Sequence, residues 1–315
     1  MRGAAGGGYV LQRLLQIVPT FLLIMVAVFC AVRLLPGDPV SALLGDHASD
    51  EAIRRLTAQM GLDRPIPEQF WLFLGDFVRG DLGTSLVLKV PVGRLILDRL
   101  PVTLFLTGFA VVIAVALAFP LAFWAALRRE RAADHAIRVA AQIGLSTPVF
   151  YVGLVLLTFL AARWRIFPVG GYGDTLADRA WHLFLPALTL ALSLAAVLMR
   201  NLRTAIIAVL DSDHVDFARA KGLRARVVLG RHVLRNALTS TVTLLGLNIG
   251  ALVGGAVVTE TVYAIPGIGR LLIDSVFGRD YPVLQGLVLT VAVLVSLVFL
   301  ATDLLLAALD PRIAR

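Results

Sequence analysis

The sequence predicts an all-α integral membrane protein with six transmembrane helices. Of its 315 residues, 58% are hydrophobic and only 16% are charged, whereas soluble domains carry about 25% charged residues. The mean hydropathy of +0.86 is correspondingly high. Six long windows contain no Asp, Glu, Lys or Arg, and they cover residues 14–32, 100–127, 139–162, 180–199, 236–259 and 281–302. A chain of this composition belongs in a bilayer.

Each window has the length of a membrane-spanning helix. The windows contain 19 to 28 residues, and about 20 apolar residues cross a hydrocarbon core of ~30 Å. Backbone polar groups must be satisfied within the segment there, which favours helices. The runs do not alternate between polar and apolar residues, so a transmembrane β-barrel is not indicated. Membrane helices tolerate prolines as kinks, and the windows contain or adjoin Pro19, Pro101, Pro120, Pro148 and Pro186.

The distribution of basic residues predicts the orientation. With the N-terminus inside, 16 Lys or Arg and 7 Asp or Glu fall in the inner segments, which are 1–13, 128–138, 200–235 and 303–315. The outer segments hold 13 Lys or Arg and 14 Asp or Glu, and they are 33–99, 163–179 and 260–280. Because basic residues gather on the cytoplasmic side, both termini are predicted to be cytoplasmic. The net charge of +8 therefore orients the chain and does not indicate a nucleic-acid partner.

Two connections are too long to be simple turns. The outer segment 33–99 is expected to form a helical insertion with two short helices, over about 50–60 and 67–78. The second helix is dense in aromatic residues, which suits a helix at the membrane surface. It either caps the helix ends or forms a docking surface. The inner segment 200–235 contains eight basic residues.

Motifs for catalysis and nucleotide binding are absent from the sequence. Neither Lys89 nor Lys221 lies in a phosphate-binding loop, and no zinc or serine-hydrolase motif occurs. The single Cys30 excludes an intrachain disulfide. The windows lack charge apart from Glu260 and Asp303 at their borders, whereas ion-coupled carriers keep intramembrane carboxylates. We therefore expect a transport protein that is not an enzyme, has no metal site and lacks an energy source of its own.

The fifth window carries a stripe of small residues. Gly246, Gly250 and Gly254 are four residues apart, so one helix face allows another helix to approach closely. That helix could belong to this chain or to a second subunit, or the face could border a pathway. Asn248 and Thr259 in this window, and Thr147 in the third, are candidate pathway residues because they are polar groups in apolar surroundings.

The inner loop contains the most informative motif. Residues 213–223 read D-H-V-D-F-A-R-A-K-G-L, and residues 231–238 read R-H-V-L-R-N-A-L. They resemble the cytoplasmic motif E-A-A-x3-G-x9-I-x-L-P in the membrane subunits of ABC importers. Asp216 takes the acidic place, Gly222 the glycine place and Leu234 the leucine place.

Departures from the general motif identify a branch of that family. Phe217 replaces an alanine, His232 the isoleucine and Arg235 the proline, as is typical of the dipeptide, oligopeptide and nickel importer permeases of the "B subunit" type. Other segments along the chain look like this branch as well, and they are 34–39, 61–65, 79–85, 186–190, 254–262, 266–270 and 308–312.

The resemblance implies a type I ABC importer permease fold, with one transmembrane domain over 1–315. It implies three kinds of partner: a second homologous permease, cytoplasmic ATP-binding subunits and an extracytoplasmic solute-binding protein. The location would be the bacterial inner membrane, in contact with lipid. ATP and Mg would be bound by the ATPase subunits, so no cofactor is expected on this chain.

The resemblance also assigns roles within the loop, where a short helix docks into the ATPase in this family. The implied coupling residues are Val215, Asp216, Phe217, Ala218, Arg219, Ala220, Lys221, Gly222, Leu223 and Leu234. Val215, Phe217 and Ala218 would supply apolar contact, while the charged residues fix the register. Glycine would end the helix by allowing a turn that a Cβ opposes.

The function expected from the resemblance is that of a permease subunit in an ATP-driven importer for peptides or a similar small solute. Dipeptides, oligopeptides, glutathione and chelated nickel all stay open as solutes. An ion-coupled secondary transporter acting alone is the competing hypothesis, and it would transport in liposomes with an ion gradient and no ATPase. A membrane scaffold without transport activity is a third.

Overall fold

The structure is a computed structural model that describes residues 4–34, 49–59, 61–224 and 227–309. These residues form helices and no strand, apart from an isolated bridge between Thr84 and Pro91, which confirms the all-α class. The helices in the first half are α1 (Ala4–Leu34), α3 (Asp50–Gln59), α4 (Ile66–Val78), α5 (Val92–Leu127), α6 (Ala132–Ser146) and α7 (Val149–Leu156). Those in the second half are α8 (Leu176–Leu210), α9 (Asp213–Ala220), α11 (Arg235–Val262), α12 (Ile268–Phe277) and α13 (Tyr281–Leu309). Two π-helical segments, η1 (Leu157–Arg163) and η2 (Val228–Leu234), continue α7 and precede α11.

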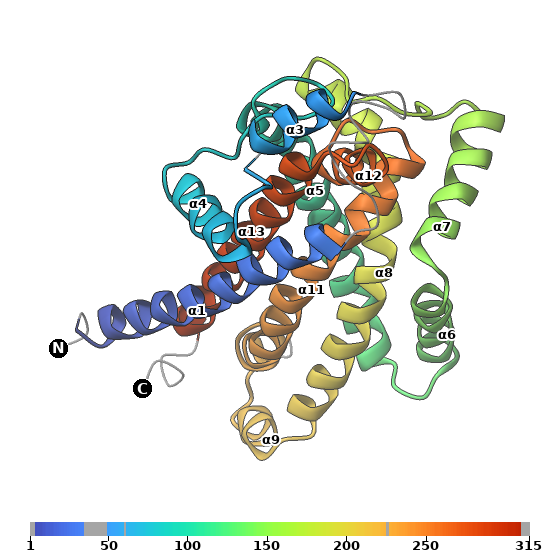
Figure 1. Ribbon diagram of the computed structural model, residues 1–315. Coiled ribbons are helices and arrows are strands. Elements are labelled where there is room, and N and C mark those ends of the chain that lie inside the picture. The colour runs from blue at the N-terminus through green and yellow to red at the C-terminus, as the bar shows by residue number, and fades with distance from the viewer. Residues whose placement is uncertain (1–3, 35–48, 60, 225–226, 310–315) are drawn as a thin grey trace.

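Long apolar helices form the body of the molecule (Figure 1). Within the described residues, α5, α8, α11 and α13 are long and apolar enough to cross a membrane, and α6 with α7 and η1 makes a bent fifth candidate. The first expected window falls in α1, whose apolar stretch Val18–Ala31 is shorter. Each of the six expected windows thus falls within helical segments, and the described residues contain four or five candidate spans by length and hydropathy.

The third window differs from the straight helix that the sequence predicts over 139–162. The chain bends by 102° between α6 and the α7–η1 segment. Thr147 at the bend is extended, with φ −87° and ψ 125°, and it precedes Pro148. Proline disfavours the helical region for the residue before it and has no N–H to donate. The effect of Pro148 is therefore a break rather than the kink that we expected.

The core lies between α5 and α8, which pack along their length (Figure 1). Buried alanines recur every fourth residue along α5, at Ala110, Ala114, Ala118, Ala122 and Ala126. Side chains four residues apart share one helix face, and small residues on that face let two helix backbones approach closely.

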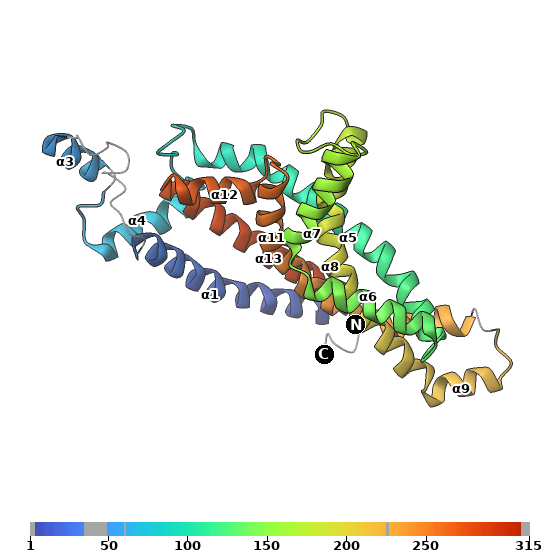
Figure 2. The ribbon, with the colours of Figure 1, turned by 90° about the vertical axis from the view of Figure 1, so that its right-hand side faces the viewer.

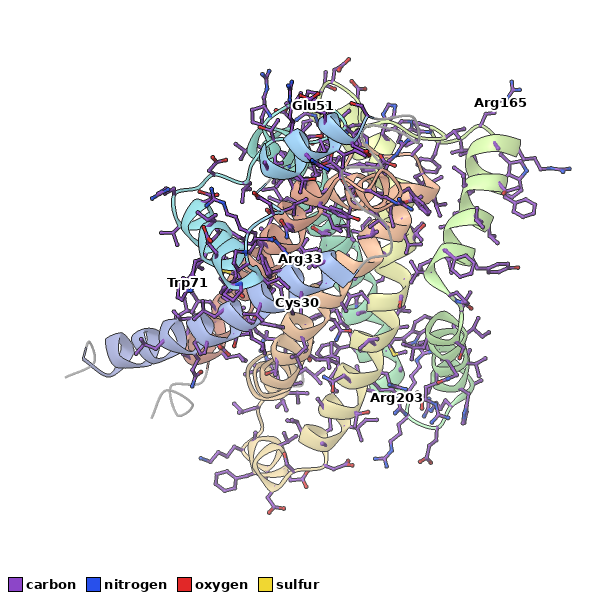
Figure 3. The ribbon with its side chains drawn as sticks, in the orientation of Figure 1. Cys30, Arg33, Glu51, Trp71, Arg165 and Arg203 are labelled. Atoms are coloured by element: carbon purple, nitrogen blue, oxygen red, sulfur yellow. The ribbon has the colours of Figure 1, made fainter. Side chains whose placement is uncertain are left out.

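The expected insertion helices are present as α3 and α4. α4 packs against α1 through aromatic rings, because Phe29 lies 5.2 Å from Phe70 and 5.8 Å from Phe73 between ring centroids. Arg33 extends this contact by donating to Gln69 Oε1 from Nε at 3.2 Å and Nη2 at 2.6 Å. Trp71 is 68% exposed and points away from the bundle (Figure 3).

The elements separate toward two ends of the molecule (Figure 2). The first turns of α1, the last turns of α13 and α9 lie toward one end, and α3 and α12 lie toward the other. The first turns of α1 and the last turns of α13 therefore lie toward the same end of the bundle as α9.

Candidate functional site

The short helix α9 has one buried and one exposed face. Val215 is fully buried and Ala218 is 5% exposed, and both belong to the main apolar core. Residues three apart lie on the same helix face. Asp216 is exposed and Phe217 is 63% exposed, with Lys221 Nζ 4.4 Å from the centre of its ring. α9 is therefore fixed to the bundle on one side and presents a phenylalanine and charged groups on the other.

Gly222 ends α9 in the way the sequence predicts. Its φ is +74°, a left-handed conformation that glycine adopts without steric cost. The Leu223 N–H donates to the Ala218 carbonyl at 3.3 Å and the Lys221 N–H donates to the Phe217 carbonyl at 3.1 Å, the pattern of a glycine-capped helix terminus. Within the described residues no atom lies within 4 Å of a Cβ built at Gly222. The backbone conformation, and not crowding, requires glycine there.

One of the remaining coupling residues, Leu223, lines a cavity next to α9. Ala220 is exposed and Leu234 in η2 is half-buried, while the side chain of Arg219 lies outside the described part. Leu223 lines a cavity of about 450 Å³ with Leu127, Ile207 and residues of η2. The cavity lies where the ends of α5 and α8 meet the inner loop.

Two ion pairs tie the helix ends near α9 to one another. Arg203 of α8 donates to Asp134 of α6 from Nε to Oδ1 and from Nη2 to Oδ2, both at 2.6 Å. Asp134 is fully buried, so this is a charge-assisted, two-pronged contact. Arg129 Nη1 donates to Asp211 Oδ2 at 2.9 Å. Sequence reasoning missed both pairs because their members lie 69 and 82 residues apart.

The glycine stripe of α11 divides between two environments. A Cβ at Gly246 would lie 2.8 Å from Thr302 Cβ, and one at Gly250 would lie 3.5 Å from Val295 Cγ1, both in α13. No described atom lies within 4 Å of a Cβ built at Gly254. The first two glycines thus pack against this chain's own α13, whereas Gly254 faces open space.

The three polar pathway candidates all donate to their own helices. Asn248 Nδ2 donates to the Leu244 carbonyl at 2.8 Å. Thr259 Oγ1 donates to the Gly255 carbonyl at 3.0 Å, and Thr147 Oγ1 donates to the Ile143 carbonyl at 2.7 Å. Thr259 is 1% exposed and offers no surface to a solute in this structure. Thr147 borders a cavity of about 430 Å³ between α6, α7 and α8.

Glu260 fixes the start of α12, a role that the sequence did not indicate. Its buried carboxylate accepts from Thr103 Oγ1 at 2.5 Å and from the Arg270 N–H at 3.0 Å. Negative charge is stabilised at a helix N-terminus. A Cβ at Gly267 would collide with this carboxylate and one at Gly269 would lie 2.5 Å from Val257 Cα. The signal available in the sequence was the acidic residue shortly before a P-G-x-G turn.

Asp280 holds the insertion to α13 in a similar way. It is 3% exposed and accepts from Ser85 Oγ at 2.5 Å and from the Leu86 N–H at 3.0 Å. Between α11 and α12, the Tyr263 hydroxyl donates to the Gly153 carbonyl at 3.0 Å. Burial raises the pKa of Tyr263 to about 12, so this phenol stays protonated and able to donate. These contacts join segments that are distant in the sequence at the end of the bundle opposite α9.

Comparisons with known proteins cover nearly the whole chain. The family model "Binding-protein-dependent transport system inner membrane component" matches residues 118–315, and "Binding-prot-dependent transport system membrane comp, N-term" matches residues 8–107. The chain is 41% identical to the glutathione transport system permease protein GsiC of Pectobacterium atrosepticum and 39% identical to that of Escherichia coli K12. Each alignment spans 305 residues, which is 97% of this chain and 98% of the relative.

Solved structures share the fold at low sequence identity. An inward-facing form of the MetNI methionine ABC transporter matches with a TM-score of 0.58 and 17% identity, over 69% of this chain and 96% of that chain. An amino acid ABC transporter with histidines matches with a TM-score of 0.53 and 17% identity, over 70% of this chain and 94% of that chain.

Proposed function

Because the chain belongs to the family of binding-protein-dependent transport system inner membrane components, we propose that it forms half of the pathway of an ATP-driven importer for glutathione or a similar short peptide. The chain is a permease subunit and not an enzyme. Permeases of this kind work with ATP-hydrolysing subunits, a second permease and a solute-binding protein. The proposed solute rests on the names of relatives that are 39 to 41% identical over 305 residues.

In our proposal, α9 is the surface that receives the ATPase subunit. The observation that carries this assignment is the division of α9 into an anchored face, with Val215 and Ala218, and an exposed face, with Asp216 and Phe217. Burying a phenylalanine contributes about 1.5–3 kcal/mol. The 63% of Phe217 that is exposed therefore offers about 1–2 kcal/mol to a partner with a matching apolar groove.

Movement of a docked ATPase would reach the spans through the contacts around α9. Val215 and Ala218 pack into the main core that α5, α8 and α11 build. The pairs Arg129–Asp211 and Arg203–Asp134 connect α8 to the α5–α6 connection and to α6. We infer that closure of the ATPase pair pulls on α9 and that these helix ends move together, which would alternate access to the pathway.

We place α9 and both termini in the cytoplasm of a bacterium and the insertion outside. The support is the excess of basic residues in the inner segments, 16 against 7 acidic, compared with 13 against 14 outside. The solute-binding protein would dock on the outer connections, where the exposed Trp71 offers apolar area. ATP and Mg are assigned to the ATPase subunits and not to this chain.

An ion-driven carrier acting alone is the competing function. It needs a carboxylate within the spans that can bind the coupling ion. Glu260 is such a group by position, but Thr103 and the start of α12 already donate to its carboxylate oxygens. This arrangement favours a structural role for Glu260 and a permease that depends on a separate ATPase.

The coupling assignment is tested by reconstituting the whole importer in vesicles with the solute-binding protein and labelled glutathione. Gly222→Pro replaces a residue with φ +74° by one restricted to about −65°, and Asp216→Arg reverses a charge on the exposed face. We expect both variants to lose ATP-driven uptake. Uptake at the wild-type rate in both would contradict the coupling role of α9.

A second readout separates docking from transport. Phe217→Ala is expected to reduce the amount of ATPase subunit that co-purifies with the permease. Phe277→Ala serves as the matched control, because Phe277 is 84% exposed and is the last residue of α12, which lies toward the other end of the bundle (Figure 2). Equal co-purification of the ATPase by both variants would contradict the proposed docking surface.

A further inference from the structure

Two adjoining cavities lie along the packing of α6 on α8. The first has a volume of about 320 Å³ and is lined by His135, Arg138, Arg200 and Arg203 together with Gln142 and apolar side chains. The second, of about 430 Å³, is lined almost entirely by apolar residues of α5, α6, α7 and α8. Ala141 and Met199 line both cavities. The two cavities therefore adjoin each other, and together they have a basic end and an apolar end.

The basic end lies on the α9 side of the bundle, where Figure 3 labels Arg203 between the lower parts of α8 and α6. No acidic residue is among those that line it, while three arginines are, and the neighbouring Asp134 binds one of them, Arg203, through both oxygens. Arg138 keeps 48% of its side chain exposed and lies 4.0 Å from Asp134. Arg200 is exposed as well. The arginines thus carry more positive charge than the single Asp134 neutralises, and this excess is accessible to an anion.

The apolar end has the depth of one membrane leaflet. Its lining on α8 runs from Met199 to Thr189, a distance of about 15 Å at 1.5 Å per residue. The hydrocarbon core is ~30 Å thick, so this length reaches about halfway across. Small residues line this cavity at Ala140 and Gly144 of α6 and at Ala196 of α8, so no bulky side chain fills it from these positions.

Interfacial residues mark the same level on the neighbouring helix. Trp124 near the end of α5 is 50% exposed, and the Arg128 guanidinium lies 5.7 Å from the centre of its ring. Tryptophan and arginine gather where the hydrocarbon meets the head groups. The α5–α6 connection that follows Arg128 leads directly to the basic cavity, which is therefore at head-group height.

We propose that this site binds an anionic phospholipid of the leaflet on the α9 side. The phosphate lies between Arg138 and Arg200, and one acyl chain extends along α8 toward Thr189. Basic pockets between transmembrane helices are suited to anionic head groups, and a soluble phosphate would have no use for the adjoining apolar cavity. The bound lipid bridges α6 and α8 beside the Arg203–Asp134 pair.

Native mass spectrometry of the assembled importer, titrated with phosphatidylglycerol or phosphatidylcholine, tests the proposal. We expect phosphatidylglycerol to bind more tightly. Replacing Arg138 and Arg200 together by Gln should weaken its binding about thirtyfold, which corresponds to about 1 kcal/mol for each arginine near an anionic surface. The substitutions leave the Arg203–Asp134 pair intact. The matched control replaces Arg163 and Arg165 by Gln, which removes the same amount of charge. Both arginines are exposed, and they lie at the far end of the α7–η1 segment, where Figure 3 labels Arg165.

A second variant tests the apolar end independently. Ala140→Phe narrows the second cavity from an exposed position on α6 and should also weaken phosphatidylglycerol binding. Glycerol 3-phosphate, which has no acyl chain, should fail to compete. The proposal would be overturned by equal binding of the two lipids or by unchanged affinity in the double Gln variant. It would also be overturned if glycerol 3-phosphate competed at the same concentrations as the lipid. Lipid binding by the isolated chain that is lost in the assembled importer would assign the groove to a protein partner and overturn it as well.

Discussion

Alanine at Gly246 and alanine at Gly254 should have opposite effects on the stability of this protein. Both glycines lie inside α11, eight residues apart. A methyl group at Gly246 would lie 2.8 Å from Thr302 Cβ and closer still to the outer atoms of that side chain, whereas no described atom lies within 4 Å of one at Gly254. The two variants therefore make the same chemical change on one helix, with and without a steric conflict.

The expected magnitude follows from two terms. Replacing a glycine inside a helix by alanine stabilises by about 1 kcal/mol, and this gain is common to both variants. Inserting a methyl group into a packed interface costs about 1–3 kcal/mol, and this cost applies only at Gly246. The free energy of unfolding of Gly254→Ala should therefore exceed that of Gly246→Ala by about 1–3 kcal/mol.

Unfolding of the purified chain in one detergent, followed by far-ultraviolet circular dichroism, measures the difference. Adding Thr302→Ala to Gly246→Ala removes Oγ1 and Cγ2 of the threonine and should recover part of the lost stability, which is a coupling between neighbours. A Gly246→Ala variant as stable as Gly254→Ala, or no recovery in the double variant, would refute the packing of α11 on α13 at Gly246.

Two further variants test the polar contacts that fix the helix ends. Asp134→Ala leaves Arg203 without its buried partner and should cost about 3–5 kcal/mol, measured by the same unfolding assay and largely recovered when Arg203 is also replaced by Met. Glu260→Ala removes the acceptor of Thr103 Oγ1 and of the Arg270 N–H, and each buried group left unsatisfied costs about 1–3 kcal/mol. The start of α12 should therefore loosen, and its amides should exchange hydrogen faster than in the wild type. Exchange at the wild-type rate would contradict the capping role of Glu260.

Much of the fold could be predicted from the sequence because membrane helices follow from length and hydropathy. The windows 100–127 and 180–199 lie inside α5 and α8, and the inner-loop helix and its glycine end are where the motif put them. The type I ABC importer permease fold, expected from the resemblance alone, is confirmed by the family match and the solved structures.

The break at Pro148 was harder to predict, since proline is compatible with a kink as well as a break. The extended conformation of Thr147 and the 102° bend depend on α6 and α7 packing separately against α8. Hydropathy carries no information on that tertiary packing.

The candidate site was predictable only in its local part. Gly222 and the apolar positions Val215 and Ala218 belong to one short segment, so spacing alone places them. Glu260 pairs with Thr103 across 157 residues and Asp280 with Ser85 across 195, and no periodicity connects such partners. The glycine stripe likewise indicated which face of the helix could pack closely but not which helix packs there. Gly246 and Gly254 have the same place in the sequence pattern, but only Gly246 is covered by α13.

Site-directed cross-linking between α9 and the ATPase subunit tests the central claim most directly. Cys30 is the single cysteine, so Cys30→Ser provides a background in which Phe217→Cys and the control Phe277→Cys each introduce one thiol. With a short bifunctional reagent and the assembled importer, we predict that position 217 cross-links to the ATPase subunit and that position 277 does not. Absence of a cross-link at position 217 in an importer that still hydrolyses ATP and transports would contradict the account.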